Sequence, residues 1–269
     1  MLSKIKSGLR RNKTAVKLYS GFRKAVFFPV RFTPWAGLQL EKAPFSDLLD
    51  FKKLNLLKTV RPYTKNGYPR LANVYDLAME AEKKNLPGAF IECGVYKGGC
   101  CAIFGAVADR FGNKRKTWYL DSFEGMPVTP SEHDGSGTEE IAGEVLRASV
   151  ADVEELVFEK LKLPRENNII VKGWFEEVLP RIKKDIGPIA VLRLDADWYE
   201  ATKLIMDELF DQVVPGGYLI FDDYARWVGS RKAVDEFLAA RGLKPEMRFI
   251  GSVDNAYGRK LAPMYFQKA

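Results

Sequence analysis

The chain has 269 residues, enough for one large α/β domain with additional length at its N-terminus. It has three cysteines, of which Cys100 and Cys101 are adjacent, and a single histidine, which excludes a disulfide framework and argues against a zinc site rich in His and Cys. The net charge of +7 arises in residues 1–32, which contain nine Lys or Arg and no Asp or Glu. The remainder is therefore about neutral, and we expect no nucleic-acid binding by the domain itself.

Residues 1–32 form a basic N-terminal arm with interleaved apolar side chains such as Phe22, Phe27 and Phe28. A basic amphipathic stretch can lie on an anionic membrane surface. Its apolar run is too short and too interrupted for a transmembrane span. A solvated helix that covers the edge of the domain is the other interpretation. Together with the cysteine usage, this predicts a cytoplasmic protein, with peripheral contact at the inner membrane face left open.

The segments that follow the arm precede the main domain. Residues 33–65 contain Pro34, Pro44 and Pro62 and are expected to be irregular. Residues 71–84 (LANVYDLAMEAEKK) have the spacing of an amphipathic helix. We therefore expect a helical and irregular N-terminal cap over residues 33–87 and the main domain over residues 88–269.

From residue 88 onward, short apolar runs alternate with helical segments, which is typical of a parallel α/β sheet. Strands are expected at residues 89–93, 117–120, 168–171, 189–194, 218–221, 247–250 and 263–267. Helices are expected at residues 99–110, 151–160, 174–184, 200–212 and 230–241. This order predicts a Rossmann-like α/β fold, a mostly parallel seven-stranded sheet with helices on both faces. In such a sheet, ligands bind at the carboxyl ends of the strands.

A glycine-rich turn follows the first strand and reads Glu92-Cys93-Gly94-Val95-Tyr96-Lys97-Gly98-Gly99. Glycines between a strand and a helix let a ligand approach the backbone and the helix N-terminal amides. The spacing differs from the G-x-G-x-x-G of dinucleotide sites. An acidic residue two positions before Gly94 suits a cofactor with a cationic amino group, such as S-adenosylmethionine. A tight turn without a ligand is the alternative interpretation.

The second strand ends at Asp121, followed by Ser122. An acidic residue at this place can accept hydrogen bonds from ribose hydroxyls. It supports a nucleoside cofactor without choosing between NAD and S-adenosylmethionine. An N-cap for the next helix is the alternative.

Four aspartates follow the fourth and fifth strands: Asp195, Asp197, Asp222 and Asp223. Asp195 and Asp197 are two residues apart and would point to the same side of an extended backbone. If the two strands are neighbours, all four carboxylates converge, and they repel one another unless a cation lies among them. We therefore expect a divalent ion such as Mg²⁺, with separate caps and surface carboxylates as the alternative.

These motifs resemble the macrocin O-methyltransferase family, which methylates sugar hydroxyls on macrolide and aminocoumarin antibiotics. The resemblance runs from about Tyr63 to Val234. It rests on Glu92-Cys93-Gly94-Val95 with Gly98-Gly99, Asp121-Ser122-Phe123-Glu124-Gly125-Met126-Pro127, Gly173-Trp174-Phe175 with Leu179-Pro180, Leu192-Arg193-Leu194-Asp195-Ala196-Asp197 with Tyr199-Glu200, and Pro215-Gly216-Gly217-Tyr218 with Asp222-Asp223-Tyr224. The aspartate elements are also similar to those of cation-dependent catechol and caffeoyl-CoA O-methyltransferases.

The resemblance implies a class I methyltransferase fold and a role for each motif. The residues that would hold S-adenosylmethionine are Thr64, Glu92, Gly94, Tyr96, Gly98, Gly99, Asp121, Ser122, Gly173 and Trp174. The divalent metal, Mg²⁺ or a similar ion, would be held by Asp195, Asp222 and Asp223. Asp197, or the ligand carboxylate of Asp195, would act as the general base. The expected reaction is methylation of a sugar hydroxyl on a glycoside, glycolipid or saccharide.

Other interpretations stay open at this stage. A catechol-like diol would satisfy the same motifs as a sugar, while a NAD-dependent oxidoreductase and a non-catalytic membrane-associated module fit them less well. His133 lies in a polar segment, residues 130–137, which would be either a lid over the acceptor or a solvated loop. The identity of the acceptor and the formation of a homo-oligomer are not determined by these patterns.

Overall fold

The computed structural model describes residues 40, 43–127, 132–135, 143, 146–251 and 262–269. The predicted basic arm, residues 1–32, lies outside the described residues, as does part of the polar segment around His133. Among the helices that the structure describes, none combines the length and apolar character needed to cross a membrane.

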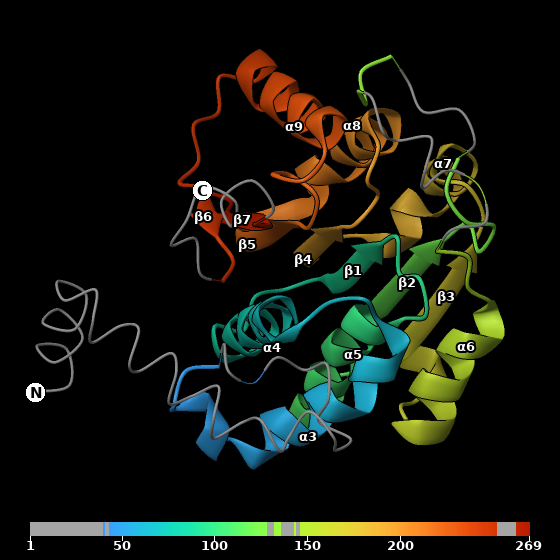
Figure 1. Ribbon diagram of the computed structural model, residues 1–269, viewed down its shortest axis with the longest axis vertical. Helices are drawn as coiled ribbons and strands as arrows, with labels where there is room; N and C mark the ends of the chain where they lie inside the picture. Colours follow the sequence, from blue (N-terminus) through green and yellow to red (C-terminus); the bar gives the residue numbers. More distant parts are fainter. Residues whose placement is uncertain (1–39, 41–42, 128–131, 136–142, 144–145, 252–261) are drawn as a thin grey trace, which may run out of the picture.

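A seven-stranded sheet forms the centre of the molecule, in the order β3-β2-β1-β4-β5-β7-β6 (Figure 1). Its strands are β1 (Ala89–Cys93), β2 (Thr117–Asp121), β3 (Asn168–Lys172), β4 (Ile189–Leu194), β5 (Val213–Phe221), β6 (Arg248–Phe249) and β7 (Met264–Gln267). Strands β1 to β5 are parallel, whereas β7 runs antiparallel to both β5 and β6. The predicted α/β class is confirmed, and the sheet is a mixed one.

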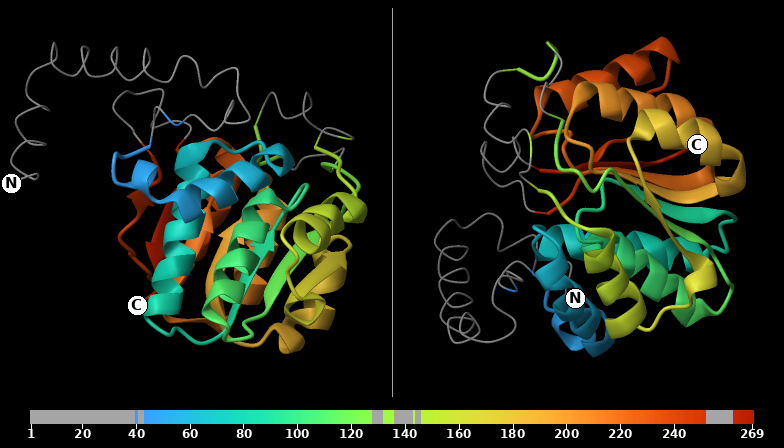
Figure 2. Two further views of the ribbon diagram at one scale, coloured as in Figure 1. Left: turned by 90° about the horizontal axis from the view of Figure 1, so that it is seen from below. Right: turned by 90° about the vertical axis from the view of Figure 1, so that its right-hand side faces the viewer.

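Helices cover both faces of the sheet, as Figure 2 shows. On one face lie α3 (Phe51–Val60), α4 (Tyr68–Lys83), α5 (Gly99–Phe111) and α6 (Val150–Glu154), and on the other α7 (Phe175–Ile186), α8 (Tyr199–Leu209) and α9 (Val228–Ala240). Side chains alternate along each strand, so Phe90 packs into the core beneath α4 and α5, while its neighbour Ile91 packs into the core beneath α7 to α9. This alternation explains why all five residues of β1 are buried.

Residues 33–65 were expected to be irregular, and for the described residues from 43 onward this prediction was wrong. The structure has a 3₁₀ turn (η3, Asp47–Leu49), helix α3 and a second 3₁₀ turn (η4, Arg61–Tyr63) in this stretch. Leu54, Leu57 and Val60 are buried at helical spacing. The pattern is interrupted by Lys53, which is also buried and thereby hides the apolar face in the sequence.

Two element boundaries also differ from prediction. Strand β5 begins at Val213, five residues before the expected start, because the Pro215-Gly216-Gly217 stretch forms a bulge inside the strand instead of a turn before it. The helix expected at residues 151–160 is α6 followed by a π-helical segment (η6, Glu155–Lys160). A short 3₁₀ turn, η8 (Phe210–Gln212), ends the segment of α8, and η7 (Arg165–Asn167) precedes β3.

The order of the strands predicts where a ligand-binding crevice lies. Strand β1 has β2 on one side and β4 on the other, so the chain reverses its direction of travel across the sheet at this point. Crevices open at the carboxyl ends of strands where this reversal occurs. The carboxyl ends of β1, β2, β4 and β5 carry the polar residues singled out in the sequence.

Candidate functional site

A cavity of about 790 Å³ lies at the carboxyl ends of these strands. Most of the site residues expected from the sequence line it: Thr64, Glu92, Gly94, Tyr96, Asp121, Ser122, Gly173, Trp174, Asp195, Asp197, Asp222 and Asp223. Gly98 and Gly99 are the expected site residues that do not line it. The cavity is large enough for a nucleoside cofactor together with an acceptor group.

The three glycines of the turn after β1 have different tasks. Gly94 has φ +88°, and a Cβ there would lie 1.9 Å from the carbonyl oxygen of Asp195, so β1 and β4 can approach each other only without a side chain. Gly98 begins α5 in a left-handed conformation, and Gly99 makes room for the backbone of Tyr63. Gly98 and Gly99 therefore shape the turn between β1 and α5. They do not line the cavity themselves.

Asp121 is fixed by backbone amides. Its Oδ2 accepts from the N–H of Tyr96 at 2.8 Å, and its Oδ1 accepts from the N–H of Phe123 at 2.8 Å. Burial raises the pKa of this carboxyl, and the two amides oppose that shift. Each oxygen retains a second lone pair, so Asp121 remains able to accept from ribose hydroxyls in the cavity. Ser122 is used locally, where its Oγ accepts from the N–H of Glu124 at 3.1 Å.

Glu92 is fully buried in β1 and paired with Arg193 of β4, the adjacent strand. Burial raises the pKa of Glu92 to about 8, although the guanidinium of Arg193 acts in the opposite direction. Its Oε1 accepts from Nη1 of Arg193, whereas its Oε2 has no partner among the described residues. A buried carboxylate oxygen without a donor costs free energy, and a cationic amino group in the cavity would satisfy it.

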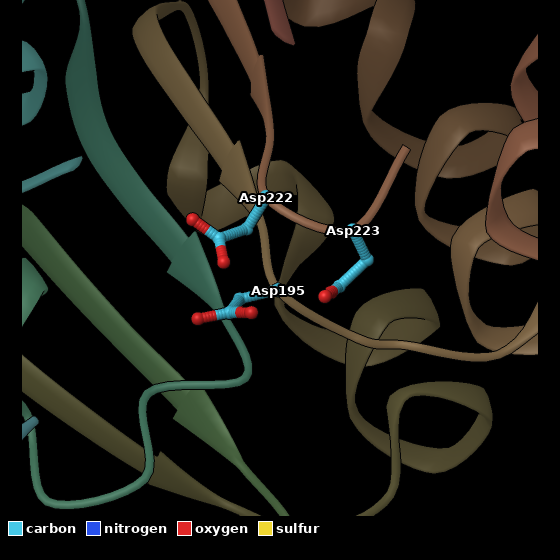
Figure 3. A group of neighbouring side chains, drawn as sticks. All are labelled: Asp195, Asp222 and Asp223. Atoms are coloured by element: carbon cyan, nitrogen blue, oxygen red, sulfur yellow. The ribbon is translucent and has the colours of Figure 1, made fainter. Parts of the chain in front are cut away.

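Three aspartates that line the cavity lie close together, as Figure 3 shows. Asp195 follows β4, Asp222 and Asp223 follow β5, and one carboxylate oxygen from each lies within 4.8 Å of the others. The two strands are hydrogen-bonded neighbours, which brings the three side chains together. Carboxylate oxygens at this spacing are the ligand set that Mg²⁺ prefers.

All four aspartates line the cavity, as expected, but Asp197 lies outside the set of carboxylate oxygens within 4.8 Å of one another. Strand β4 ends at Leu194, and Asp197 has φ +55°, so the two-residue alternation of an extended strand does not extend to it. Its Oδ1 instead accepts from Nε1 of Trp227 at 2.7 Å. Burial, and then the charge of Asp195, raise the pKa of Asp197 to about 7. Asp197 still lines the cavity, beside the cluster.

Two arginines neutralise part of the acidic cluster. Arg193 is fully buried and contacts Glu92, Asp195 and Asp222, and Arg70 from the first turn of α4 also contacts Asp222. The region contains two guanidinium groups and five carboxyl groups, those of Glu92, Asp195, Asp197, Asp222 and Asp223. Burial raises the pKa of Asp223 well above its ordinary value, with the charge of Asp197 acting in the same direction. A divalent cation among these oxygens would favour their ionised forms and offset their negative charge.

Sequence reasoning assigned no role to either arginine. Arg193 lies in an otherwise apolar strand, IAVLRL, and Glu92 lies in AFIEC. A charged residue inside an apolar strand is rarely buried unless it is paired, so these two opposite charges in the two apolar strands were the available signal. Arg70 carried no such signal because it lies in the first turn of a helix that precedes the sheet.

His133 lies outside the cavity lining. Its Nδ1 is 2.7 Å from Nζ of Lys232, and its ring packs edge-on against Tyr199 at 4.3 Å between centroids. The next residue, Asp134, is buried and lines the cavity, and its Oδ1 accepts from the N–H of Tyr199 at 2.7 Å. The described part of this segment therefore ties the loop to the start of α8.

The sequence is similar to those of known methyltransferases. The family described as macrocin-O-methyltransferase (TylF) matches residues 58–260. The chain is 33% identical over 189 residues to demethyldecarbamoylnovobiocin O-methyltransferase of Streptomyces niveus, covering 69% of this chain and 71% of that relative. It is 32% identical over 174 residues to 8-demethyl-8-(2,3-dimethoxy-alpha-L-rhamnosyl)-tetracenomycin-C 4'-O-methyltransferase of Streptomyces olivaceus, covering 61% of this chain and 63% of that relative.

A solved structure gives the same picture. The chain is similar to the O-methyltransferase NovP, with a TM-score of 0.65 and 30% sequence identity, over 77% of this chain and 82% of that one. The family match over residues 58–260 contains β1 to β6 and all the site residues discussed above.

Proposed function

Since the chain belongs to the macrocin-O-methyltransferase family and is an S-adenosylmethionine-dependent O-methyltransferase, we propose that it methylates a sugar hydroxyl and requires a divalent cation to do so. The acceptor would be a glycoside, a glycolipid or another saccharide. The relatives support this choice, because the name of one of them specifies a rhamnosyl group.

The observation that carries the metal requirement is the approach of Asp195, Asp222 and Asp223 within one cavity. The donor set consists of carboxylate oxygens, which suits Mg²⁺, and it lacks the His and Cys ligands that zinc prefers. Arg193 and Arg70 offset only part of the charge. Asp223 in particular contacts neither arginine in the ion pairs of the described residues.

The other half of the cavity would hold the cofactor. Glu92 offers a buried oxygen without a donor to the amino group, and Asp121 offers acceptor capacity to the ribose. Trp174, which precedes α7, provides an aromatic wall near Gly173. When bound, S-adenosylmethionine supplies the methyl group on its sulfonium. The task of these three side chains is to bind and orient it, and correct placement accounts for much of the rate in such a transfer.

The aspartates would prepare the acceptor. A divalent cation on Asp195, Asp222 and Asp223 would supply positive charge that lowers the pKa of a hydroxyl beside it. Asp197 is our candidate for the group that removes the proton. Trp227 holds one of its oxygens, which fixes the side chain, and the other oxygen can accept from an acceptor hydroxyl. Trp198 lines the cavity next to Asp197 and provides an apolar surface for a sugar ring.

The direct test is methyl transfer from labelled S-adenosylmethionine to a panel of acceptors: free glycosides, lipid-linked saccharides and catechols. We expect transfer to a saccharide in the presence of Mg²⁺ and loss of transfer in EDTA that is restored by added Mg²⁺. Equal methyl transfer with and without EDTA would show that the reaction does not require a divalent cation. Transfer to catechols alone would replace the sugar by a catechol-like diol.

A further inference from the structure

An exposed apolar patch lies at the N-terminal edge of the described fold. Phe45, Leu49 and Phe51 are 71%, 63% and 71% exposed. They flank the 3₁₀ turn η3 and the start of α3. A single exposed apolar side chain is ordinary, but three large ones within seven residues form a surface that favours contact with another apolar phase.

Two charged residues of the same stretch, Asp47 and Lys53, are paired with each other, whereas Ser46 and Lys52 are exposed. Lys53 is almost completely buried, and its Nζ contacts Asp47 at 2.8 Å and Asp76 at 2.7 Å. Tyr68 donates its hydroxyl to Asp47 at 2.5 Å, and Asp50 caps α3 by accepting from the N–H of Lys53 at 2.9 Å. These ion pairs and hydrogen bonds hold the stretch against the domain, while its phenylalanine and leucine side chains remain exposed beside Lys52.

The segment that bears the patch lies outside the part of the chain shared with the family. The family match begins at residue 58, whereas the patch ends at Phe51. The 39 residues that lead up to Leu40 contain nine Lys or Arg and no Asp or Glu. The surface and the segment before it therefore combine exposed apolar side chains with a large positive charge.

We propose that residues 1–57 bind the chain to the surface of an anionic lipid bilayer, with Phe45, Leu49 and Phe51 as the apolar anchors. The positive charge attracts anionic headgroups, and each Lys or Arg near the surface adds to that attraction. The three apolar side chains enter the interfacial region, as those of amphipathic anchors do. A second copy of this chain fits less well, because it carries the same net positive charge of +7.

The position of the patch relates it to the cavity. Helix α3 is ten residues long, or about 15 Å. It leads through η4 to Thr64 and Lys65, which line the cavity. Membrane contact at Phe51 would therefore place the bilayer about one helix length from the part of the cavity lined by Thr64 and Lys65. This inference goes beyond the proposed function and does not require it, because vesicle binding needs neither cofactor nor acceptor.

The test is co-sedimentation of the full chain with vesicles rich in phosphatidylglycerol and with vesicles of phosphatidylcholine alone. We expect binding to the anionic vesicles only. The triple variant Phe45→Ser, Leu49→Ser, Phe51→Ser should lower the partition coefficient about tenfold or more, because three apolar side chains are lost from the interface. The matched control changes three other exposed apolar residues, Val228→Ser, Leu243→Ser and Phe249→Ser, and should bind like the wild type.

Several results would overturn the proposal. If the triple variant binds vesicles as well as the wild type does, the three apolar side chains are not the anchors. If deletion of residues 1–39 leaves binding unchanged, their positive charge does not contribute to it. If the triple variant changes the oligomeric state in light scattering while vesicle binding persists, the patch is an interface between copies instead. Circular dichroism checks that each variant is folded, and the single variant Phe45→Glu repeats the test if the triple variant is not.

Discussion

Arg193 donates from Nη2 to Oδ1 of Asp222 at 2.5 Å, between strands β4 and β5, where water reaches almost none of either side chain. The same guanidinium also contacts Glu92, on the cofactor side of the cavity. One buried cation is therefore shared by the residues that would bind the cofactor and those that would bind the metal. This explains how so many acids can be buried together before any metal is present.

Replacing Asp223 by Asn should weaken metal binding about tenfold or more, because it removes the ligand that neither arginine contacts. The fall is measured as the affinity for Mn²⁺ by electron paramagnetic resonance. Glu200→Gln is the control, since Glu200 lines the cavity but lies outside the aspartate cluster. Equal Mn²⁺ affinity in the Asp223 variant and the wild type would argue against a metal at this place.

The Glu92→Gln variant should bind S-adenosylhomocysteine about 10- to 100-fold more weakly than the wild type. The reason is the loss of a charged hydrogen bond from the cofactor's amino group inside a buried region. Isothermal titration calorimetry gives the dissociation constant. Glu176→Gln, an exposed residue that also lines the cavity, should change it little. An unchanged affinity for Glu92→Gln would show that this carboxylate serves only to pair Arg193.

Gly94→Ala should lower the free energy of unfolding by more than about 3 kcal/mol, because the new Cβ would meet the backbone of Asp195 and the position has φ +88°. Gly112→Ala is the matched control. Gly112 also has positive φ, +66°, but no atom lies within 4 Å of its Cβ position, so the cost there is the strain alone, about 1 kcal/mol. Urea denaturation gives the free energy of unfolding of both variants. If both lose the same amount, the close approach of β1 and β4 is not what requires a glycine at position 94.

Asp197→Asn should reduce kcat by about 100-fold or more while leaving Mn²⁺ and S-adenosylhomocysteine affinities near those of the wild type, since the change removes a proton acceptor from beside the cluster. Trp227→Phe should have a smaller effect on kcat, because it removes only the indole N–H that holds the carboxylate. If Asp197→Asn retains full activity, the base is another group, and Asp195 becomes the candidate.

Most of the fold could be predicted because the five parallel strands are short apolar runs separated by helices, and the family resemblance read from the motifs is confirmed by the match over residues 58–260. Helix α3 was missed for a physical reason. Lys53 is buried by its pairing with Asp47 and Asp76, and such pairing across the fold leaves no local trace in the sequence. The bulge in β5 was missed because Pro-Gly-Gly is far more often a turn.

The positions of the candidate site residues were also predictable only in part. Neighbouring strand ends bring Asp195, Asp222 and Asp223 together, and this follows from strand order alone. The direction of the Asp197 side chain does not follow from strand order. It depends on the positive φ of Asp197 itself and on the hydrogen bond from Trp227, which is 30 residues away. The network of Arg193 and Arg70 likewise depends on packing between elements that are distant in the sequence.

The most direct test of the central claim is a crystal structure with S-adenosylhomocysteine and Mn²⁺, with the metal located by its anomalous signal. The account predicts one strong peak among the carboxylates of Asp195, Asp222 and Asp223, with the cofactor's amino group at Glu92. Bound S-adenosylhomocysteine without an anomalous peak at these three aspartates would contradict it.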